Sequence, residues 1–73
     1  MALIRLKAEV AGKVWKIEAQ PGQQVAKDDA VLVLECMKME IPVEAPGPAQ
    51  VREILVRVGD TVREGQEVAL LEG

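Results

Sequence analysis

Short apolar runs rich in valine and leucine recur along the chain, and groups of turn-forming residues separate them. Valine and isoleucine are β-branched and favour pleated strands over helices. In the segment 52–58, alternation would place Ile54, Val56 and Val58 on one face of a strand. The pattern also predicts strands over residues 3–9, 14–18, 31–34, 40–45 and 68–71, with Pro42 tolerable if its strand lies at a sheet edge.

Turn residues divide these segments. The predicted turns are Pro21-Gly22, Gly59-Asp60 and Glu64-Gly65. Val14 and Ile17 are three positions apart, as are Val51 and Ile54, so neither pair follows regular two-residue alternation. A β-bulge or burial of both faces would explain this spacing. A short helix is the competing interpretation, and the nearby proline and glycines limit its length.

The chain repeats itself at an offset of 37 residues without a gap. The matched pairs are Ala8/Ala45, Val14/Val51, Ile17/Ile54, Gly22/Gly59, Val25/Val62, Val31/Val68, Leu34/Leu71 and Glu35/Glu72. Residues 1–73 are expected to form a single domain with repeats roughly over 8–36 and 45–73. Two similar β units predict an all-β, pseudo-twofold sandwich or flattened barrel. The segment between them would be a hairpin with Lys38 near its tip.

Composition excludes several functions. The net charge of −3 and the scattered Lys and Arg residues argue against a nucleic-acid surface. The absence of histidine removes the commonest general base and most zinc sites, so neither catalysis nor a metal site is expected. The single cysteine, Cys36, cannot form a disulfide within the chain. There is no signal-peptide pattern and no apolar run of membrane-spanning length, which predicts a soluble, cytoplasmic protein without a membrane partner.

The junction of the repeats reads ECMKMEI, residues 35–41, and its candidate functional residue is Lys38. A Schiff-base or general-base lysine needs a desolvated pocket or a neighbouring cation. Glu35 and Glu40 are close in the sequence and favour the charged amine instead. Acylation by another enzyme needs only an exposed amine on a fixed backbone. An ordinary solvated turn lysine is the simplest interpretation of the spacing alone.

The neighbours of Lys38 also allow more than one interpretation. Met37 and Met39 would point to one face of a strand, opposite the lysine. Methionines usually fill a core, but their flexibility also suits a surface that binds several partners in turn. Cys36 has no histidine to activate it and is expected to be a small buried thiol.

The motif ECMKMEI resembles the attachment motif of biotinyl domains, in which Met-Lys-Met follows a small residue and the central lysine receives biotin. The resemblance runs from about Ala8 to Glu72, and residues 59–66, GDTVREGQ, are similar to a repeated turn of that family. It implies the biotinyl/lipoyl fold, a barrel-sandwich hybrid of two antiparallel sheets with Lys38 on a protruding hairpin. Related lipoyl domains usually carry Asp-Lys-Ala, so the two methionines favour biotin.

The resemblance is greatest to the biotin carboxyl carrier protein of acetyl-CoA carboxylase, which serves fatty acid biosynthesis, and of related carboxylases. It implies that a biotin protein ligase attaches biotin to Lys38, and that Glu35, Met37, Met39 and Glu40 form the surface the ligase reads. The biotin arm would carry a carboxyl group from a biotin carboxylase to a carboxyltransferase and on to an acceptor, most often an acyl-CoA. A lipoyl carrier of a 2-oxoacid dehydrogenase complex and an unmodified adaptor domain are the alternatives.

Four positions depart from the family pattern. Cys36 stands in place of a usual alanine, and Ala49 and Glu9 in place of a usual glycine and proline. Asp28 replaces a glycine that its repeat partner Gly65 retains, and aspartate tolerates the left-handed conformation better than most residues. The departures at Asp28, Ala49 and Glu9 affect local turns, whereas Cys36 lies within the attachment motif, where the small change in size is expected to be accepted by the ligase. The initiating methionine favours a free-standing subunit over an excised domain.

Overall fold

The computed structural model describes residues 2–73, which contain eight strands and no helix. The strands are β1 (Leu3–Lys7), β2 (Gly12–Ile17), β3 (Gln24–Val25), β4 (Ala30–Cys36), β5 (Met39–Glu44), β6 (Ala49–Ile54), β7 (Thr61–Val62) and β8 (Glu67–Glu72). The described residues accordingly include no helix long and apolar enough to cross a membrane. The predicted all-β class is confirmed. The two-residue strands β3 and β7 were not predicted, because two paired residues leave no periodic pattern in the sequence.

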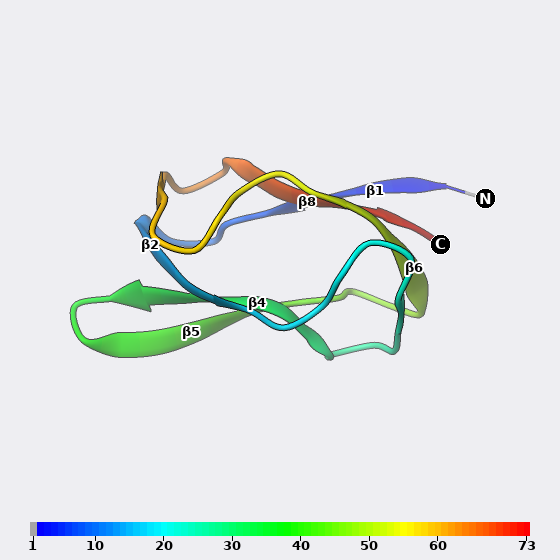
Figure 1. Cartoon of the computed structure of the whole chain (residues 1–73), viewed down its shortest axis with the longest axis horizontal. Coiled ribbons are helices and arrows are strands. Elements are labelled where there is room, and N and C mark those ends of the chain that lie inside the picture. Colours follow the sequence, from blue (N-terminus) through cyan, green and yellow to red (C-terminus); the bar gives the residue numbers. More distant parts are fainter. Residues whose placement is uncertain (1) are drawn as a thin grey trace.

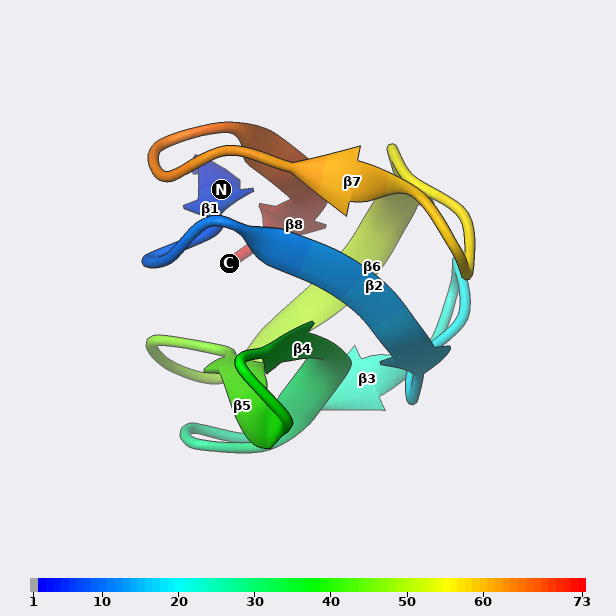
Figure 2. The ribbon, with the colours of Figure 1, turned by 90° about the vertical axis from the view of Figure 1, so that its left-hand side faces the viewer.

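The strands form two four-stranded antiparallel sheets, with the orders β1-β8-β6-β3 and β5-β4-β2-β7. The two sheets lie one above the other in Figure 1 and surround a common interior in the end-on view of Figure 2. Strands β1, β2, β3 and β4 correspond to β5, β6, β7 and β8, respectively. Exchanging each strand for its counterpart converts one sheet order into the other. The predicted pseudo-twofold sandwich is therefore confirmed, and both sheets are antiparallel as the resemblance implied.

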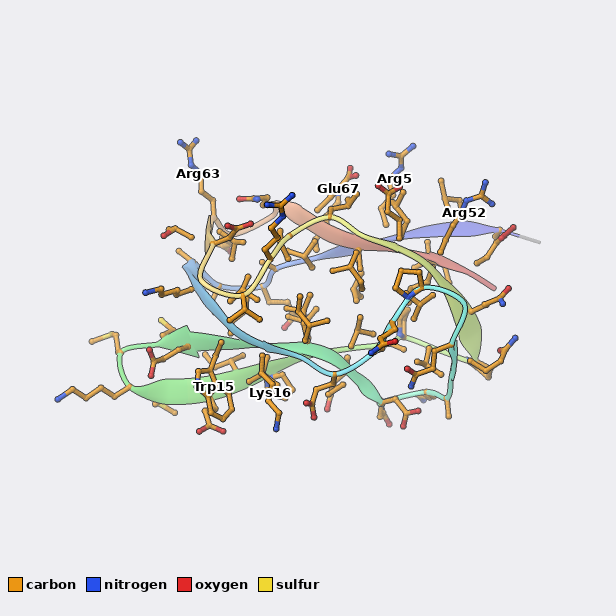
Figure 3. The ribbon with its side chains drawn as sticks, in the orientation of Figure 1. Arg5, Trp15, Lys16, Arg52, Arg63 and Glu67 are labelled. Atoms are coloured by element: carbon orange, nitrogen blue, oxygen red, sulfur yellow. The ribbon has the colours of Figure 1, made fainter. Side chains whose placement is uncertain are left out.

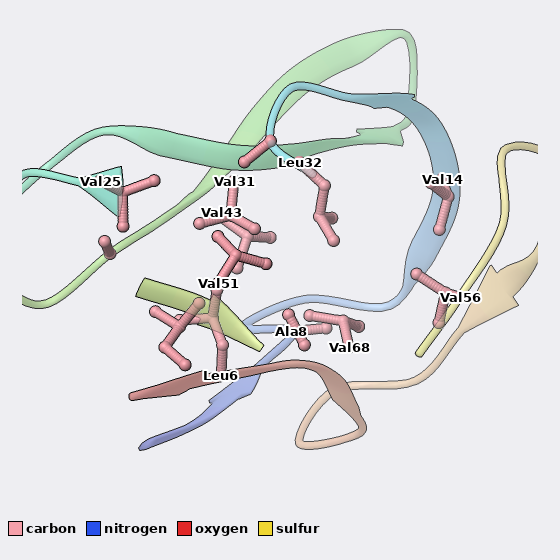
Figure 4. Close-up of a cluster of buried hydrophobic side chains, with 14 of the residues drawn as sticks. Leu6, Ala8, Val14, Val25, Val31, Leu32, Val43, Val51, Val56 and Val68 are labelled. Carbon is pink, nitrogen blue, oxygen red and sulfur yellow. The ribbon is translucent and has the colours of Figure 1, made fainter. Parts of the chain in front are cut away.

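The inward faces of both sheets build one apolar core (Figure 4). Its largest fully buried side chains are Leu32, Leu34, Leu71, Val14, Val31, Val51, Val62 and Val68. In the part of the chain that the structure describes, no polar or charged side chain is buried. The side chains between the sheets therefore pack through aliphatic contacts, and the repeat supplies matching core positions from each half.

Both sheets contain the irregularity that the valine–isoleucine spacing suggested. The register of β2 against β4 shifts between Val14 and Lys16, and that of β6 against β8 shifts between Val51 and Glu53. An extra residue on one strand explains why the apolar positions are three apart. The prediction of a bulge is confirmed, and the competing helix is wrong.

The strand predicted over 52–58 is wrong beyond Ile54, where β6 ends. Val56 is buried, but Val58 is 62% exposed and does not share a core face with Ile54. The reason is the crossing between the sheets: the Gly59 N–H donates to the Val14 carbonyl at 2.8 Å and draws the chain towards β2. The strand predicted over 3–9 likewise ends at Lys7.

The turn at Asp28 keeps the geometry of its glycine-containing counterpart. Asp28 has a φ of 72°, and Gly65 has a φ of 85°. The Asp28 N–H donates to the Ala45 carbonyl at 2.8 Å, and the Gly65 N–H donates to the Ala8 carbonyl at 2.7 Å. The expectation that aspartate preserves the turn is confirmed.

Asp28→Gly is expected to stabilise the domain by about 0.5–1 kcal/mol, because relief of the left-handed strain exceeds the entropy cost of glycine. The matched control is Gly65→Asp, which is expected to destabilise by a similar amount. Urea unfolding measures both, as opposite shifts of the midpoint with an unchanged slope. A lower midpoint for Asp28→Gly would contradict this account of the turn.

Candidate functional site

The segment between the repeats is a hairpin with a two-residue turn. Strands β4 and β5 pair up to Cys36 opposite Met39, and Met37 and Lys38 connect them. Met37 has a φ of 52° and Lys38 a φ of 65°, so both central residues are left-handed, as in a type I′ turn. Asparagine and glycine usually occupy such positions, and an ordinary L-residue costs about 1–2 kcal/mol there. Strain of this kind concentrates at functional sites.

The hairpin projects from one end of the molecule. The domain measures 35 × 17 × 17 Å, and the β4–β5 turn lies at the opposite end of the long axis from both termini (Figure 1). This confirms that Lys38 is held out from the body near a hairpin tip.

The Lys38 side chain is exposed, and it takes part in none of the three ion pairs formed by the described residues. Glu35 and Glu40 face each other across β4 and β5 and do not pair with the lysine. The amine is therefore accessible to an approaching reagent.

Both methionines beside Lys38 face solvent. Met37 is 91% exposed and Met39 is 65% exposed, so the suggestion that they fill the core is wrong. The placement of Met37 by strand alternation is also wrong, because Met37 belongs to the turn. Exposed apolar side chains on a projecting turn offer contact area to a partner protein.

Cys36 and Gly12 form the base of the hairpin. Cys36 is half-buried, so the expectation of a buried thiol is only partly met. A Cβ atom added to Gly12 would lie 2.7 Å from the Glu35 carbonyl oxygen and 3.6 Å from the Cys36 Cβ. The sequence showed the glycine but not its reason, since only folding brings β2 this close to the end of β4.

Gly12→Ala is expected to destabilise the domain by about 1–3 kcal/mol, because backbone on one of the two strands must move to relieve the contact. Gly47→Ala is the matched control: no atom lies within 4 Å of its added Cβ, and a change within about 0.5 kcal/mol is expected. Thermal unfolding followed by circular dichroism compares them. Equal midpoints would show that the close approach at Gly12 is unimportant.

Exposure does not by itself distinguish Lys38 from the other lysines. All five lysines of the chain are exposed. Lys7, Lys13 and Lys16 lie on strands, and the Lys16 amine pairs with Glu18 at 3.4 Å. Lys27 lies in the short turn before β4. Among residues 2–73, only the β4–β5 turn combines a lysine, two exposed methionines and left-handed backbone at both central positions.

The chemistry available at this site is that of an acceptor. An exposed primary amine on a fixed turn can be acylated by a second protein, and the attached group can then move around the tip. Among residues 2–73, no group of three or more His, Cys, Asp or Glu side chains is placed to hold a metal ion.

Comparison with known proteins shows the family to which the chain belongs. Residues 5–71 match the biotin/lipoyl family described as "Biotin-requiring enzyme". The chain is 42% identical over 57 residues to a biotin/lipoyl attachment protein of Bacillus subtilis (strain 168), which is 78% of each chain. It is 36% identical over 66 residues to a biotinylated protein TB7.3 homolog of Mycobacterium leprae (strain TN), covering 90% of this chain and 93% of that protein. The chain belongs to the biotin/lipoyl attachment family.

Solved structures agree with this assignment. The urea carboxylase of Kluyveromyces lactis matches 97% of this chain with a TM-score of 0.92 and 35% identity, and the chain spans 6% of that protein. A lipoyl domain of the 2-oxoglutarate dehydrogenase complex from Azotobacter vinelandii matches 88% of this chain with a TM-score of 0.72 and 28% identity, across 81% of that domain. The fold is thus shared by both branches of the family.

Proposed function

We propose that this chain is a non-catalytic biotin carboxyl carrier and that Lys38 is the residue to which biotin is attached. The observation that carries the proposal is the position of Lys38 on the strained β4–β5 turn, beside Met37 and Met39 and remote from the body of the domain. The family match and the biotinylated relative support covalent biotin as the cofactor.

The residues of the hairpin fit a covalently attached group. An acyl group on Lys38 needs no cavity, because the amine is exposed and makes no ion pair that would have to be broken. Once attached, biotin supplies a ring nitrogen that can carry a carboxyl group. The rigid turn keeps the base of the arm fixed, and tethering raises the local concentration of the carried group at each partner's active site.

The proposed partners follow from this role. A biotin protein ligase would recognise the hairpin through Glu35, Met37, Met39 and Glu40, all of which are exposed. A biotin carboxylase would then load the carrier, and a carboxyltransferase would pass the carboxyl group to an acceptor such as an acyl-CoA, as in acetyl-CoA carboxylase. We expect these reactions to occur in the cytoplasm.

A lipoyl carrier is the second candidate, because the Azotobacter vinelandii lipoyl domain shares the fold. The Met-Lys-Met turn favours biotin, since lipoyl domains usually carry Asp-Lys-Ala at this place. The two acyl groups differ in mass, so one measurement separates them.

Co-expression with a biotin protein ligase and excess biotin is expected to add one biotinyl group per chain. Intact mass spectrometry checks the number and identity of the added group, and a streptavidin blot checks it independently. Expression with a lipoate ligase and lipoate, in place of the biotin system, is the matched control and is expected to leave the mass unchanged. A chain that stays unmodified beside an active biotin ligase, or that takes lipoate instead, would contradict the proposal.

A further inference from the structure

A surface hollow lies beside the hairpin, where β2 and the β6–β7 loop meet the end of β4. Its volume is about 240 Å³, and its lining comprises Lys13, Val14, Trp15, Glu35, Val58 and Gly59. Trp15 projects from the outer face of the β5-β4-β2-β7 sheet, on the opposite side of the molecule from Arg5 and Arg52 (Figure 3).

The apolar side chains that line the hollow are partly exposed to solvent. Trp15, which is the only aromatic residue of the chain, is 44% exposed, and Val58 is 62% exposed. The Lys16 amine lies 5.4 Å from the centre of the indole ring and pairs with Glu18, so it is already engaged. Apolar side chains left in water favour a ligand with an apolar body.

The rim of the hollow is polar and has no net charge. Lys13 and Glu35 are direct partners in the β2–β4 register. Neither side chain takes part in any hydrogen bond or ion pair found in residues 2–73. A carboxylate that accepts hydrogen bonds therefore lies beside an ammonium group that donates them.

In the other half of the molecule, the side chains at the corresponding positions have partners. At the repeat offset, Trp15 corresponds to Arg52 and Glu35 to Glu72. Arg52 Nη1 lies 3.1 Å from Glu72 Oε1, and the Gln50 amide donates to the Gly22 carbonyl at 3.1 Å. These side chains thus have partners at the end that carries the termini, where a hollow lined by Gln50 and Glu72 is nevertheless present. Within residues 2–73, the side chains of Lys13 and Glu35 have no such partner at the end that carries Lys38.

We propose that this hollow receives the biotinyl ring attached to Lys38, with the apolar part of the ring against Trp15 and Val58 and its ureido group at Glu35 and Lys13. A ureido group carries N–H donors and a carbonyl acceptor, which matches a rim of one acceptor and one donor group. This inference rests on the proposed attachment site and adds a resting position for the arm.

The arm can reach the hollow. Glu35 precedes Lys38 by three positions, and three residues of extended strand span about 10 Å. The lysine side chain and the valeryl chain of biotin together are long enough to fold back over that distance. A charged side chain of another protein would bind less well in the hollow, because Lys13 would repel a cation and Glu35 would repel an anion.

The test compares the unmodified and the fully biotinylated chain by ¹H–¹⁵N NMR and by acrylamide quenching of tryptophan fluorescence. On biotinylation, the Trp15 indole N–H and the Val58 and Gly59 amides are expected to shift together with the amides of the turn. Trp15 is the only tryptophan, so quenching reports on the hollow alone. If the ring spends about half its time docked, the quenching constant falls about twofold.

Two variants sharpen the comparison. Trp15→Arg places at the hollow the side chain that pairs with the glutamate in the other half, and the shifts at Val58 and Gly59 are expected to disappear in its biotinylated form. Arg52→Ala, at the equivalent position, is expected to leave these shifts as in the wild type. Shifts confined to residues 37–39, with unchanged quenching, would overturn the docked position. Absence of the added mass would contradict the attachment itself and is detected separately.

Discussion

Lys38→Arg is expected to abolish biotin attachment to this chain. Arginine keeps the positive charge and much of the length of the side chain, but its guanidinium group stays protonated and does not act as the nucleophile that forms the amide. The turn should persist, because the substitution leaves the apolar pairs of β4 and β5 untouched. Intact mass after co-expression with the ligase is expected to equal that of the unmodified variant.

The matched control for this prediction is Lys27→Arg. Lys27 is exposed in the short turn before β4, and its substitution is expected to leave biotin incorporation complete. The unfolding free energies of both variants should stay within about 0.5 kcal/mol of the wild type, because neither lysine makes an ion pair within residues 2–73. Biotin retained in Lys38→Arg, with a normal fold, would refute the assignment of the site.

Leu34→Ala is expected to lower the free energy of unfolding by about 2–5 kcal/mol, the usual range for truncating a buried leucine. Leu34 is fully buried in β4, the strand that pairs with both β2 and β5 and leads into the hairpin. Small domains sit near the lower end of the usual 5–15 kcal/mol of stability, so the loss should remove most of it. Urea unfolding, followed by circular dichroism, is expected to show a much lower midpoint or no folded baseline.

Leu3→Ala provides the same chemical change at an exposed position. Leu3 is 48% exposed at the start of β1, and a change within about 0.5 kcal/mol is expected. Similar midpoints for the two leucine variants would contradict the view that the aliphatic interior holds the sheets together. Biotinylation of Leu34→Ala should also fall as the folded population falls, because the turn depends on the pairing of β4 with β5.

Much of the fold follows from patterns that the sequence carries locally. The repeat pairs Val14 with Val51 and Leu34 with Leu71, and all four side chains are fully buried. The three-residue spacing in each repeat corresponds to a register shift at the same place in each sheet. The hairpin at the junction could be expected because it joins two copies of one unit.

Other features depend on contacts that no local pattern records. Val58 alternates correctly for a strand, yet the bond from Gly59 to Val14 takes the chain across to the other sheet and leaves Val58 exposed. The hollow at Trp15 could not be foreseen either, because β2, β4 and the β6–β7 loop meet only in the folded chain.

The candidate site was foreseen in part. Lys38 stood out by its position between the repeats, and the structure places it on a turn with left-handed backbone at two non-glycine residues. The sequence alone could not show that strain, because methionine and lysine are not residues that such turns prefer. The roles of Glu35, Met37, Met39 and Glu40 in ligase recognition stay predictions.

The most direct measurement is peptide mapping of the biotinylated wild-type chain. Trypsin does not cleave after an acylated lysine, so attachment at Lys38 predicts a single biotinylated peptide spanning residues 28–52, with fragment ions that place the added mass on residue 38. Lys7, Lys13, Lys16 and Lys27 should remain unmodified. Recovery of unmodified 28–38 and 39–52 peptides, with biotin on another lysine, would contradict the account.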